Sequence, residues 1–532
     1  MKKTILLALF SGFLVSAWGQ RNVDVLHYRY ELELSDKTDS VFGKATIRVR
    51  FLAESTKIRF DLTSPRKDGR GMFAYNISED NAAPMESVHS NNVINLTLSG
   101  KKSVNDTASY TIYFRGIPAD GLIISRNMYG NRTFFADNWP NRAHCWIPCV
   151  DDPADKATVE FLVTAPSHYQ VVSNGIQLEE INLTGDKKFT HWKEEVPLPT
   201  KVMVIGVADF AVQHAGFVNN CIPVSSWVFP ETTDKGFYDY AIGRDIAAFF
   251  DQYIGPYPYK KLANVQSKTI YGGMENAGAI FYYESSVTGR RSEESLFSHE
   301  IAHQWFGDMA TEKSFAHLWL SEGFATYLTH IYMESKYGTD SLKARMQEDR
   351  EAVLDFVRQS KRPVVDSTPN YKSLLNANSY QKGGWVLHML RRELGDSVFH
   401  ECIRHYYAQY AGGNAETTDF RKIVEGISGR EFSQFFRQWL FTPVNPRIAV
   451  SWKYQPGEKN LQVTITQLQA SAPFDLPLEL LLNMEGNKSF VKELHISKQA
   501  ETFSIPLTGA LQSIVPDPEI SLLAEITVNQ EK

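Results

Sequence analysis

Two histidines of the sequence have the spacing of metal ligands. His299 and His303 lie four residues apart in the segment HEIAH. On a helix this spacing puts both imidazoles on one face, one turn apart, where they can bind one zinc ion at about 2.0–2.1 Å. Glu300 follows the first histidine and is predicted to act as the general base on the water at the metal. The alternative is a surface helix with two unrelated histidines, but Trp305 and Phe306 favour a buried face.

Glu322 offers a third ligand. It lies nineteen residues after His303, at the start of the next predicted helix. A hairpin of two helices can bring its carboxylate back to the histidine face. Two histidines, one glutamate and one open position are typical of a catalytic zinc site rather than a closed structural one. The alternative for Glu322 is an ordinary carboxylate at a helix N-terminus, where the helix dipole favours negative charge.

Two predicted helices carry these groups. The first begins near Ser292 with an acidic first turn and ends at Gly307. The second begins near Ser321 and ends near Gly338, and its apolar residues recur at helical spacing. Residues 418–440 predict one or two further helices.

The rest of the chain predicts a multidomain α+β fold. Its 532 residues, 43% of them hydrophobic, are too many for one core. Residues 20–200 show alternation with period two, as in 28–34 and 45–51, which predicts an N-terminal antiparallel β domain. Residues 201–442 are predicted to be mainly helical. Alternation returns after two prolines, so residues 443–532 fit a C-terminal β-sandwich.

Residues 1–19 predict a secretory signal peptide. Two lysines precede an apolar run over residues 5–15, and the small residues Ala17 and Gly19 follow. The run is shorter than the roughly 20 residues that span a bilayer, although an N-terminal anchor is the alternative. We therefore expect export to the periplasm or the extracellular space, with no stable membrane span after cleavage.

Charge and cysteine content narrow the function classes. The formal net charge is −6 without long runs of one sign, which argues against nucleic acid or an anionic membrane as a partner. The four cysteines match no zinc-finger spacing. Cys145 and Cys149 are close enough in sequence to form a disulfide in an oxidising compartment, and buried free thiols are the alternative. The oligomeric state is not predicted.

Five segments carry a recognisable pattern when taken together. They are Gly272-Gly273-Met274-Glu275-Asn276, HEIAHQWFGD (299–308), WLSEGFATY (319–327), Tyr380-Gln-Lys-Gly383 and NRAHCWIPCVDDPADKAT (141–158). Taken alone, residues 272–276 predict a loop turn, and Tyr380 predicts ordinary packing. Together the segments resemble the M1 family of zinc aminopeptidases, and the resemblance covers nearly all of the mature chain. It implies a thermolysin-like catalytic domain, one zinc ion per chain and peptide substrates with a free N-terminus.

The resemblance also implies roles for single residues. In the family, the strand matching residues 272–276 binds the substrate backbone, and the glutamate matching Glu275 binds the α-amino group. A substrate without a free amine leaves that buried carboxylate unpaired, which is costly. Tyr380 matches the tyrosine that donates its hydroxyl to the oxyanion. Gly273 stands where alanine is commoner, which implies a slightly wider site.

Some positions depart from the family pattern or align ambiguously with it. Phe315 and His317 replace a common tryptophan and an acidic or amide residue, and we expect both to pack near the site. The second amine ligand of the family, in the N-terminal domain, could be Asp137 or Asn138. The sequence ends after the predicted β-sandwich, without the large helical C-terminal domain of many members, so we expect a short form with a more open site.

Three functions from different classes compete. The first is a zinc-dependent aminopeptidase that hydrolyses the N-terminal peptide bond. The second is a zinc endopeptidase or related hydrolase on the same metal site, which Glu275 disfavours because it favours a free amine. The third is a non-catalytic zinc-binding scaffold, which would require the loss of Glu300 or Tyr380, and both are present.

Overall fold

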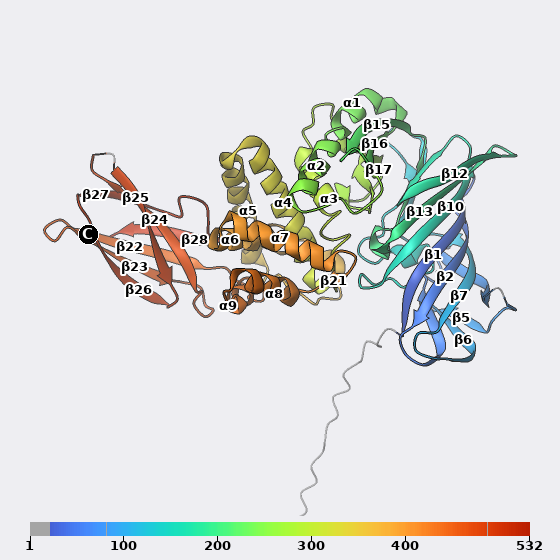
Figure 1. Cartoon of the computed structure of the whole chain (residues 1–532), viewed down its shortest axis with the longest axis horizontal. Coiled ribbons are helices and arrows are strands. Elements are labelled where there is room, and N and C mark those ends of the chain that lie inside the picture. The colour runs from blue at the N-terminus through green and yellow to red at the C-terminus, as the bar shows by residue number, and fades with distance from the viewer. Residues whose placement is uncertain (1–21, 81, 487, 532) are drawn as a thin grey trace, which may run out of the picture.

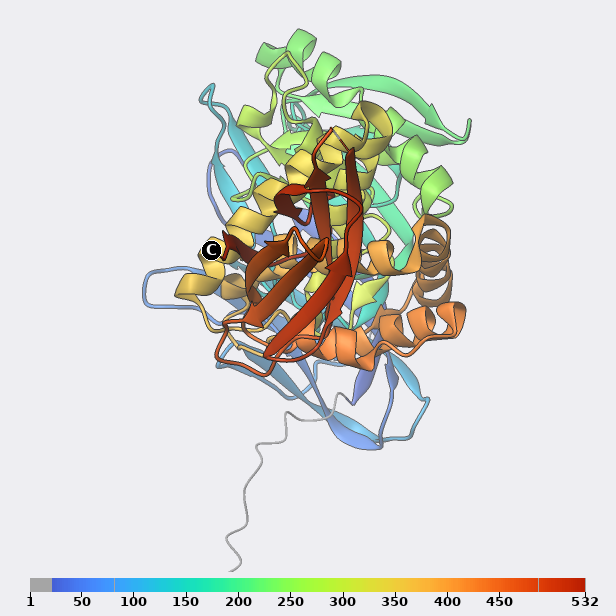
Figure 2. The same cartoon turned by 90° about the vertical axis from the view of Figure 1, so that its left-hand side faces the viewer.

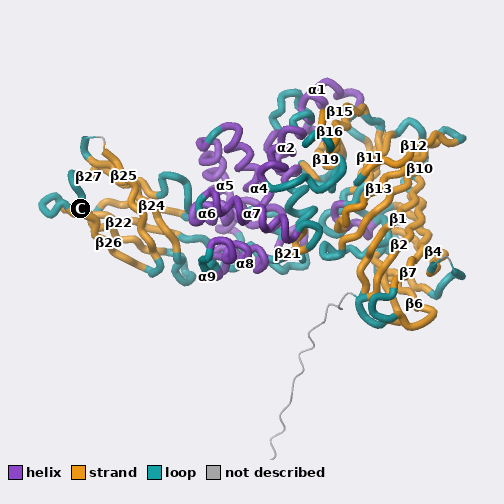
Figure 3. Tube along the Cα trace, viewed as in Figure 1, coloured by secondary structure: helices purple, strands orange, loops and turns teal. Residues whose placement is uncertain are grey.

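The computed structural model describes residues 22–80, 82–486 and 488–531. The predicted signal peptide at residues 1–19 lies outside this part. A β-rich N-terminal part, a helical middle part and a C-terminal group of strands follow one another along the long axis (Figures 1 and 3). In the described part, no helix has the length and apolar character needed to cross a bilayer.

Alternating side chains build the largest N-terminal sheet. β1 (Val23–Glu33) and β2 (Val41–Phe51) bury roughly every second residue and pair antiparallel. However, β1 pairs in parallel with β10 (Lys156–Pro166), so the predicted purely antiparallel domain is wrong at this pair. A parallel pair needs a long connection, and here the chain leaves β1 and returns only after it has formed several other strands.

The N-terminal part contains three sheets, ordered β12-β13-β10-β1-β2-β7-β4, β11-β14-β9-β8 and β3-β6-β5. The second includes β14 (Ile205–Ala208), so this part extends past residue 200. Its remaining strands are β3 (Ser55–Asp61), β4 (Gly71–Glu79), β5 (Ser87–Ser90), β6 (Val93–Lys102), β7 (Thr107–Ile117), β8 (Leu122–Arg126), β9 (Arg132–Ala136), β11 (Gln170–Ser173), β12 (Ile176–Leu183) and β13 (Lys187–Pro199).

The helical pattern expected from residue 201 begins later than predicted. A five-stranded mixed sheet comes first, in the order β15-β16-β17-β19-β18, so β18 is an edge strand. These strands are short, and β17 is buried at every position, so they lack the alternation that reveals a strand in sequence. Their bounds are β15 (Ala211–Val218), β16 (Ile222–Val228), β17 (Leu262–Ser267), β18 (Gly273–Met274) and β19 (Ala279–Tyr283).

The two helices predicted around the metal ligands are present. α3 (Glu294–Ala302) ends before the predicted Gly307, because the chain turns sharply after His303. α4 (Trp319–Tyr337) ends at Gly338 as predicted. The other helices are α1 (Thr233–Tyr240), α2 (Gly243–Tyr253), α5 (Thr339–Gln359), α6 (Gly383–Leu394), α7 (Asp396–Tyr410), α8 (Thr417–Ser428) and α9 (Ser433–Leu440), with a short pair β20 (Thr311–Glu312) and β21 (Asn414–Ala415).

The C-terminal part consists of strands. They form a four-stranded sheet, β26-β23-β22-β28, and a three-stranded sheet, β25-β24-β27. Figure 2 shows these strands in front of the helical part, seen along the long axis. Their bounds are β22 (Arg447–Gln455), β23 (Asn460–Gln467), β24 (Leu476–Met484), β25 (Lys488–Ile496), β26 (Ala500–Pro506), β27 (Leu511–Pro516) and β28 (Glu525–Gln530).

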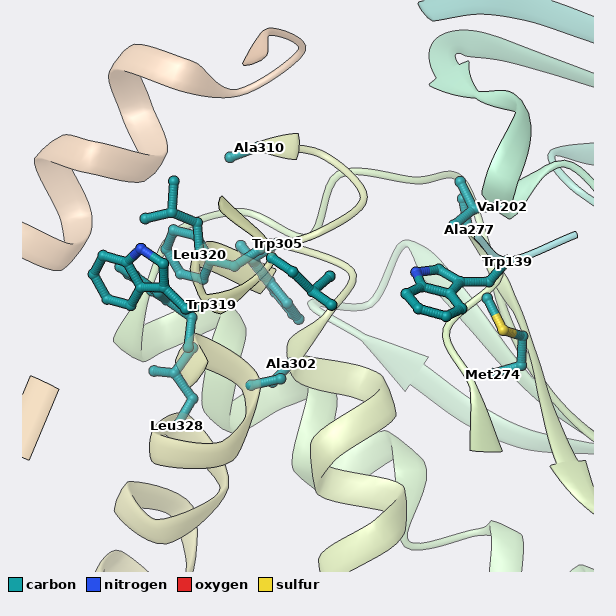
Figure 4. Close-up of a cluster of buried hydrophobic side chains, with 14 of the residues drawn as sticks. Trp139, Val202, Met274, Ala277, Ala302, Trp305, Ala310, Trp319, Leu320 and Leu328 are labelled. Atoms are coloured by element: carbon teal, nitrogen blue, oxygen red, sulfur yellow. The ribbon is translucent and has the colours of Figure 1, made fainter. Parts of the chain in front are cut away.

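Large buried aromatic residues fix the helices that carry the predicted ligands. Trp305 follows α3, Trp319 begins α4, and both are fully buried in the core. In Figure 4 these two residues lie on one side of the view, and Trp139 lies beside Met274 on the other. The indole of Trp305 donates to the carbonyl of Gly255 at 2.9 Å, and that of Trp319 to the hydroxyl of Thr417 at 2.9 Å. These two hydrogen bonds anchor the end of α3 and the start of α4.

Candidate active site

The three predicted metal ligands lie together. The Nε2 atoms of His299 and His303 are 3.1 Å apart. A carboxylate oxygen of Glu322 lies 3.3 Å from the first of these atoms and 3.2 Å from the second. In the described part of the chain, no other group of three or more His, Cys, Asp or Glu residues has its ligand atoms within 4.8 Å of one another.

This triangle fits a tetrahedral zinc ion. Donors bound to tetrahedral zinc at about 2.0–2.1 Å are roughly 3.3–3.4 Å apart, close to the three distances found. The charge of the site also suits a metal cation. Three carboxylates, those of Glu275, Glu300 and Glu322, are each only 5% exposed. Burial alone would lower the pKa of His303, but these carboxylates raise it to about 10. The site thus has an excess of buried negative charge that a divalent cation would neutralise.

Neighbouring groups orient the ligands. Nδ1 of His303 lies 3.1 Å from the carbonyl oxygen of Phe306 and 3.1 Å from the hydroxyl of Ser321. Because a carbonyl only accepts hydrogen bonds, Nδ1 carries a proton, so Nε2, which faces the triangle, is the nitrogen left to bind a metal. Burial acts to raise the pKa of Glu322, but the two imidazoles hold it well below its usual range, so this carboxylate is ionised.

Glu300 lies next to the ligands without belonging to them. Its carboxylate makes no side-chain hydrogen bond with a described residue, although its backbone belongs to α3. Burial raises the pKa of Glu300 well above its usual range; His303 opposes the rise, and the neighbouring carboxylates add to it. A Cβ atom on Gly273 would lie only 2.3 Å from a carboxylate oxygen of Glu300. The space created by this glycine is therefore occupied by Glu300, which corrects the expectation that it widens the site for substrate.

Glu275 follows the edge strand β18, and its carboxylate is unusual. One of its oxygens is buried and has no hydrogen-bond partner. Burial raises the pKa of Glu275, while His303 and Lys201 oppose the rise. Its backbone carbonyl accepts a hydrogen bond of 2.7 Å from Gln304, which fixes the strand against the end of α3. The protein thus positions Glu275 but leaves one of its carboxylate oxygens without a hydrogen bond.

Tyr380 reaches the ligands from a π-helical turn, Asn378–Lys382, that precedes α6. Its ring stacks on that of His299, with the centroids 5.8 Å apart and the planes at 17°. Burial, together with nearby carboxylates, raises the pKa of Tyr380 well above its usual value, so its hydroxyl keeps its proton. Two glycines let α4 and the start of α6 lie close together, which brings Tyr380 near the ligands. A Cβ on Gly323 of α4 would lie 2.8 Å from the backbone of Gly383, the first residue of α6.

These groups line one cavity of about 640 Å³. The predicted metal ligands, Glu300, Tyr380 and residues 272–275 all line this cavity. Asn276 does not, and it is buried with both side-chain polar atoms unpartnered. The helical spacing after Glu322 could have revealed Thr326, Thr329 and His330, since residues three to four apart share a helix face. No comparable signal in the sequence indicates the other lining residues. The lining residues not predicted are Trp139, Tyr271, Ser295, Leu296, Thr326, Thr329, His330, Arg345, Asp349, Leu375, Asn376, Ala377 and Gln381.

The two candidates for a second amine ligand already have partners. Asp137 is paired with Arg142 and accepts bonds of 3.0 Å from Thr269 and from the backbone of Ile270. The Asn138 amide donates to two backbone carbonyls at 3.1 and 2.6 Å and accepts from an indole at 2.9 Å. Neither lines the cavity. Both instead support the wall around Trp139, which does.

The departures from the expected pattern have packing roles. Phe315 packs against Trp139, with ring centroids 5.9 Å apart. A ring nitrogen of His317 lies 2.9 Å from the hydroxyl of Thr417, at the start of α8. Cys145 and Cys149 are separate buried thiols, which agrees with the alternative to a disulfide.

Comparisons with known proteins place this geometry in a family. Residues 25–202 match the family model described as "Peptidase M1 N-terminal domain". Residues 240–439 match the family model described as "Peptidase family M1 domain". The chain is 28% identical over 341 residues to aminopeptidase M1 of Arabidopsis thaliana and 27% identical over 446 residues to probable aminopeptidase 2 of Sulfurisphaera tokodaii. It is 26% identical over 430 residues to tricorn protease-interacting factor F2 of Thermoplasma acidophilum.

The similarity covers more of this chain than of its relatives. These three alignments cover 61%, 76% and 75% of this chain, but 38%, 56% and 52% of the respective relatives. The chain thus spans about half the length, or less, of these curated relatives. The two family matches together account for well over half of the residues and include every predicted ligand. The chain belongs to peptidase family M1.

Proposed function

We propose that this protein is a zinc-dependent aminopeptidase that hydrolyses the N-terminal peptide bond of peptides. The observation that carries the proposal is the buried carboxylate of Glu275, one oxygen of which has no hydrogen-bond partner, in the same cavity as the His299–His303–Glu322 triangle. A buried carboxylate without a partner is costly, and the ammonium of a free N-terminus supplies the missing charge. The names of the relatives, two of which are aminopeptidases, support the same activity.

The metal would be held by His299, His303 and Glu322. When bound, zinc supplies a Lewis acid that makes a water molecule more acidic and polarises a carbonyl oxygen. Glu300 accepts the proton of the attacking water and passes it to the leaving nitrogen. Burial raises the pKa of Glu300 well above its usual range, which makes this carboxylate a stronger proton acceptor than an exposed glutamate.

Tyr380 is the group in this chain that donates to the developing oxyanion. Its hydroxyl remains protonated, and its ring is fixed by stacking on His299. Such a donor needs no reorganisation at the moment of reaction, which is what makes electrostatic stabilisation effective.

The edge strand β18 orients the peptide. β18 pairs with β19 on one side only, so its other edge is free to pair with an extended peptide. Met274 belongs to this strand and Glu275 follows it. A peptide paired with β18 therefore places its N-terminus at Glu275 and the first peptide bond one residue further on. This arrangement favours removal of single residues over internal cleavage.

The test compares free and blocked peptides. We expect N-acetylated peptides to be cut very poorly, because they leave Glu275 unpaired and add bulk where the ammonium would bind. Glu275→Ala should lower kcat/KM for free peptides much more than for blocked ones, while the zinc content stays the same. Efficient cleavage of acetylated peptides at internal bonds by the unmodified protein would contradict the proposal and favour the endopeptidase alternative.

We also propose the finer organisation and the location. An N-terminal β domain extends past residue 200 to include β14, and a thermolysin-like catalytic domain follows up to residue 442. Residues 443–532 form a C-terminal β-sandwich. The apolar faces of the two C-terminal sheets, buried in the core, support the sandwich. Residues 1–19 direct export to the periplasm or extracellular space, which measuring the mature N-terminus and the cell fraction would test.

A further inference from the structure

Arg345, on α5, is the only lysine or arginine among the described residues that line the catalytic cavity. Its Nε atom is buried and has no hydrogen-bond partner. Within the described chain, no carboxylate lies within ion-pair distance of its guanidinium. By contrast, Arg350 on the same helix is paired with Asp517. Arg345 is therefore a cation that the fold brings to the cavity and leaves without an anion.

The nearest acidic residue on this face already has a partner. Asp349 lies one helical turn after Arg345 and also lines the cavity. Its carboxylate accepts a hydrogen bond of 2.8 Å from His330 on α4, which joins the two helices. This contact holds α5 against α4 and engages Asp349 elsewhere, so the guanidinium remains available to a ligand.

Arg345 lies on the wall of the cavity that the leaving part of the peptide would face. α4 packs between α3 and α5, and Figure 1 shows these two helices on different sides of α4. Glu275 belongs to the wall next to α3, and Arg345 to the wall formed by α5. If Glu275 binds the N-terminal ammonium and the metal donors face the first carbonyl, the rest of the peptide extends toward α5.

The length of α4 between Glu322 and His330 indicates how many peptide residues lie between the metal donors and the α5 wall. His330 follows Glu322 by eight residues on α4, which is about 12 Å along the helix axis. An extended peptide advances about 3.3–3.6 Å per residue, so this span corresponds to roughly three residues beyond the metal. The α5 wall therefore meets the second or third residue of the leaving peptide rather than a distant part of a long chain.

We propose that Arg345 binds a substrate carboxylate on the leaving side of the scissile bond, so that short peptides with a free C-terminal carboxylate are preferred. The planar guanidinium matches a carboxylate and can donate two parallel hydrogen bonds to it. A free short peptide carries an ammonium at one end and a carboxylate at the other. The cavity offers the opposite charge to each. This proposal rests on the proposed aminopeptidase function.

The test is a length series. Leucine followed by one, two or three alanines is prepared as the free acid and as the C-terminal amide, and kcat/KM is measured for each. We expect the free acid to be preferred by about tenfold or more at one of these lengths, the size of a charge-assisted hydrogen bond. In Arg345→Met this preference should fall to within about twofold of unity. Arg345→Lys should retain part of it, because the charge remains but the two parallel bonds do not.

A matched control and a second carboxylate source sharpen the test. Arg358→Met changes an exposed arginine on the same helix and should leave the preference intact. An amide series with aspartate or asparagine after the leucine tests an acidic side chain as the source of the carboxylate. An Arg345-dependent preference for aspartate supports the proposal with a side-chain carboxylate. If neither carboxylate produces a preference that depends on Arg345, the proposal is wrong.

Binding separates this proposal from the enzymatic one. The dissociation constants of the same peptides are measured by calorimetry with the Glu300→Gln variant of the full chain. Tighter binding of the free acid, lost on Arg345→Met, supports the carboxylate site even if the unmodified protein hydrolyses nothing. Equal binding of acid and amide at every length, with equal affinity for the aspartate and asparagine peptides, would overturn it even if hydrolysis is rapid.

Discussion

The metal donors and the charged groups around them differ in how the protein holds them. The donors have neighbours that fix their orientation, as the carbonyl of Phe306 does for His303. Glu275 and Arg345, in contrast, lie on the cavity wall, and each has a buried side-chain atom that no described residue hydrogen-bonds. Preformed partners suit a metal site, which must exist before substrate arrives. Unsatisfied charges suit groups that a ligand completes.

The energetic cost of these groups favours the same distinction. A buried charge without a partner destabilises the fold, and it persists only where function compensates for the cost. Neutralising a donor should therefore lower both activity and stability. Neutralising an unpartnered group should lower activity without lowering stability.

The largest expected effect is that of Glu322→Gln. We expect zinc binding to weaken strongly and turnover to disappear, because an amide is a poorer and uncharged ligand. Zinc bound only to the folded state raises Tm, so chelation should lower the Tm of the unmodified protein but not that of the variant. Zinc content and thermal unfolding with and without a chelator provide the measurements. Glu348→Gln, an exposed change on α5, is the control. Full zinc occupancy with normal activity would remove Glu322 from the ligand set.

Glu300→Gln should separate catalysis from metal binding. We expect a loss of about 10²–10⁴-fold in kcat, the range for general acid–base catalysis, with zinc content unchanged. The buried carboxylate of Glu300 accepts no hydrogen bond from a described residue, so the Tm of the variant should equal or exceed that of the unmodified protein. Turnover, zinc analysis and thermal unfolding are measured on one preparation. Near-normal turnover in a zinc-loaded variant would exclude Glu300 as the base.

Tyr380→Phe should give a loss of about 10²–10³-fold confined to kcat. The oxyanion exists only in and after the transition state, so KM should change little. An oxyanion donor contributes about 2.7–4 kcal/mol, which corresponds to this loss. Tyr238→Phe, an exposed change on α1, is the control. A raised KM with an unchanged kcat would make Tyr380 a substrate-binding residue instead.

The metal donors and the residues on the cavity wall also differ in how well they could be predicted from sequence. His299, Glu300 and His303 lie within one helix, so their spacing alone fixes their relative positions. Glu322 required only that α4 return beside α3. Arg345 lies 23 residues after Glu322 on a helix whose packing no local pattern describes, and Trp139 comes from the N-terminal part. The strand β18 has only two residues, too few to show a periodic pattern, so only the family resemblance indicated it.

The smallest expected effect is that of Gly273→Ala, which tests whether an unpartnered group is nevertheless positioned. A Cβ at residue 273 would come within 2.3 Å of the Glu300 carboxylate. That carboxylate is the end of a flexible side chain, so it can move aside at little cost to stability, but it would then leave the position set for the attacking water. We expect kcat to fall about tenfold, less than the 10²-fold that a 1 Å misplacement can cost, with zinc content and Tm unchanged. In the Glu300→Gln background the same change should have almost no effect on kcat, because no base remains to be displaced. Equal losses in both backgrounds would show that the methyl group acts on the substrate strand rather than on Glu300.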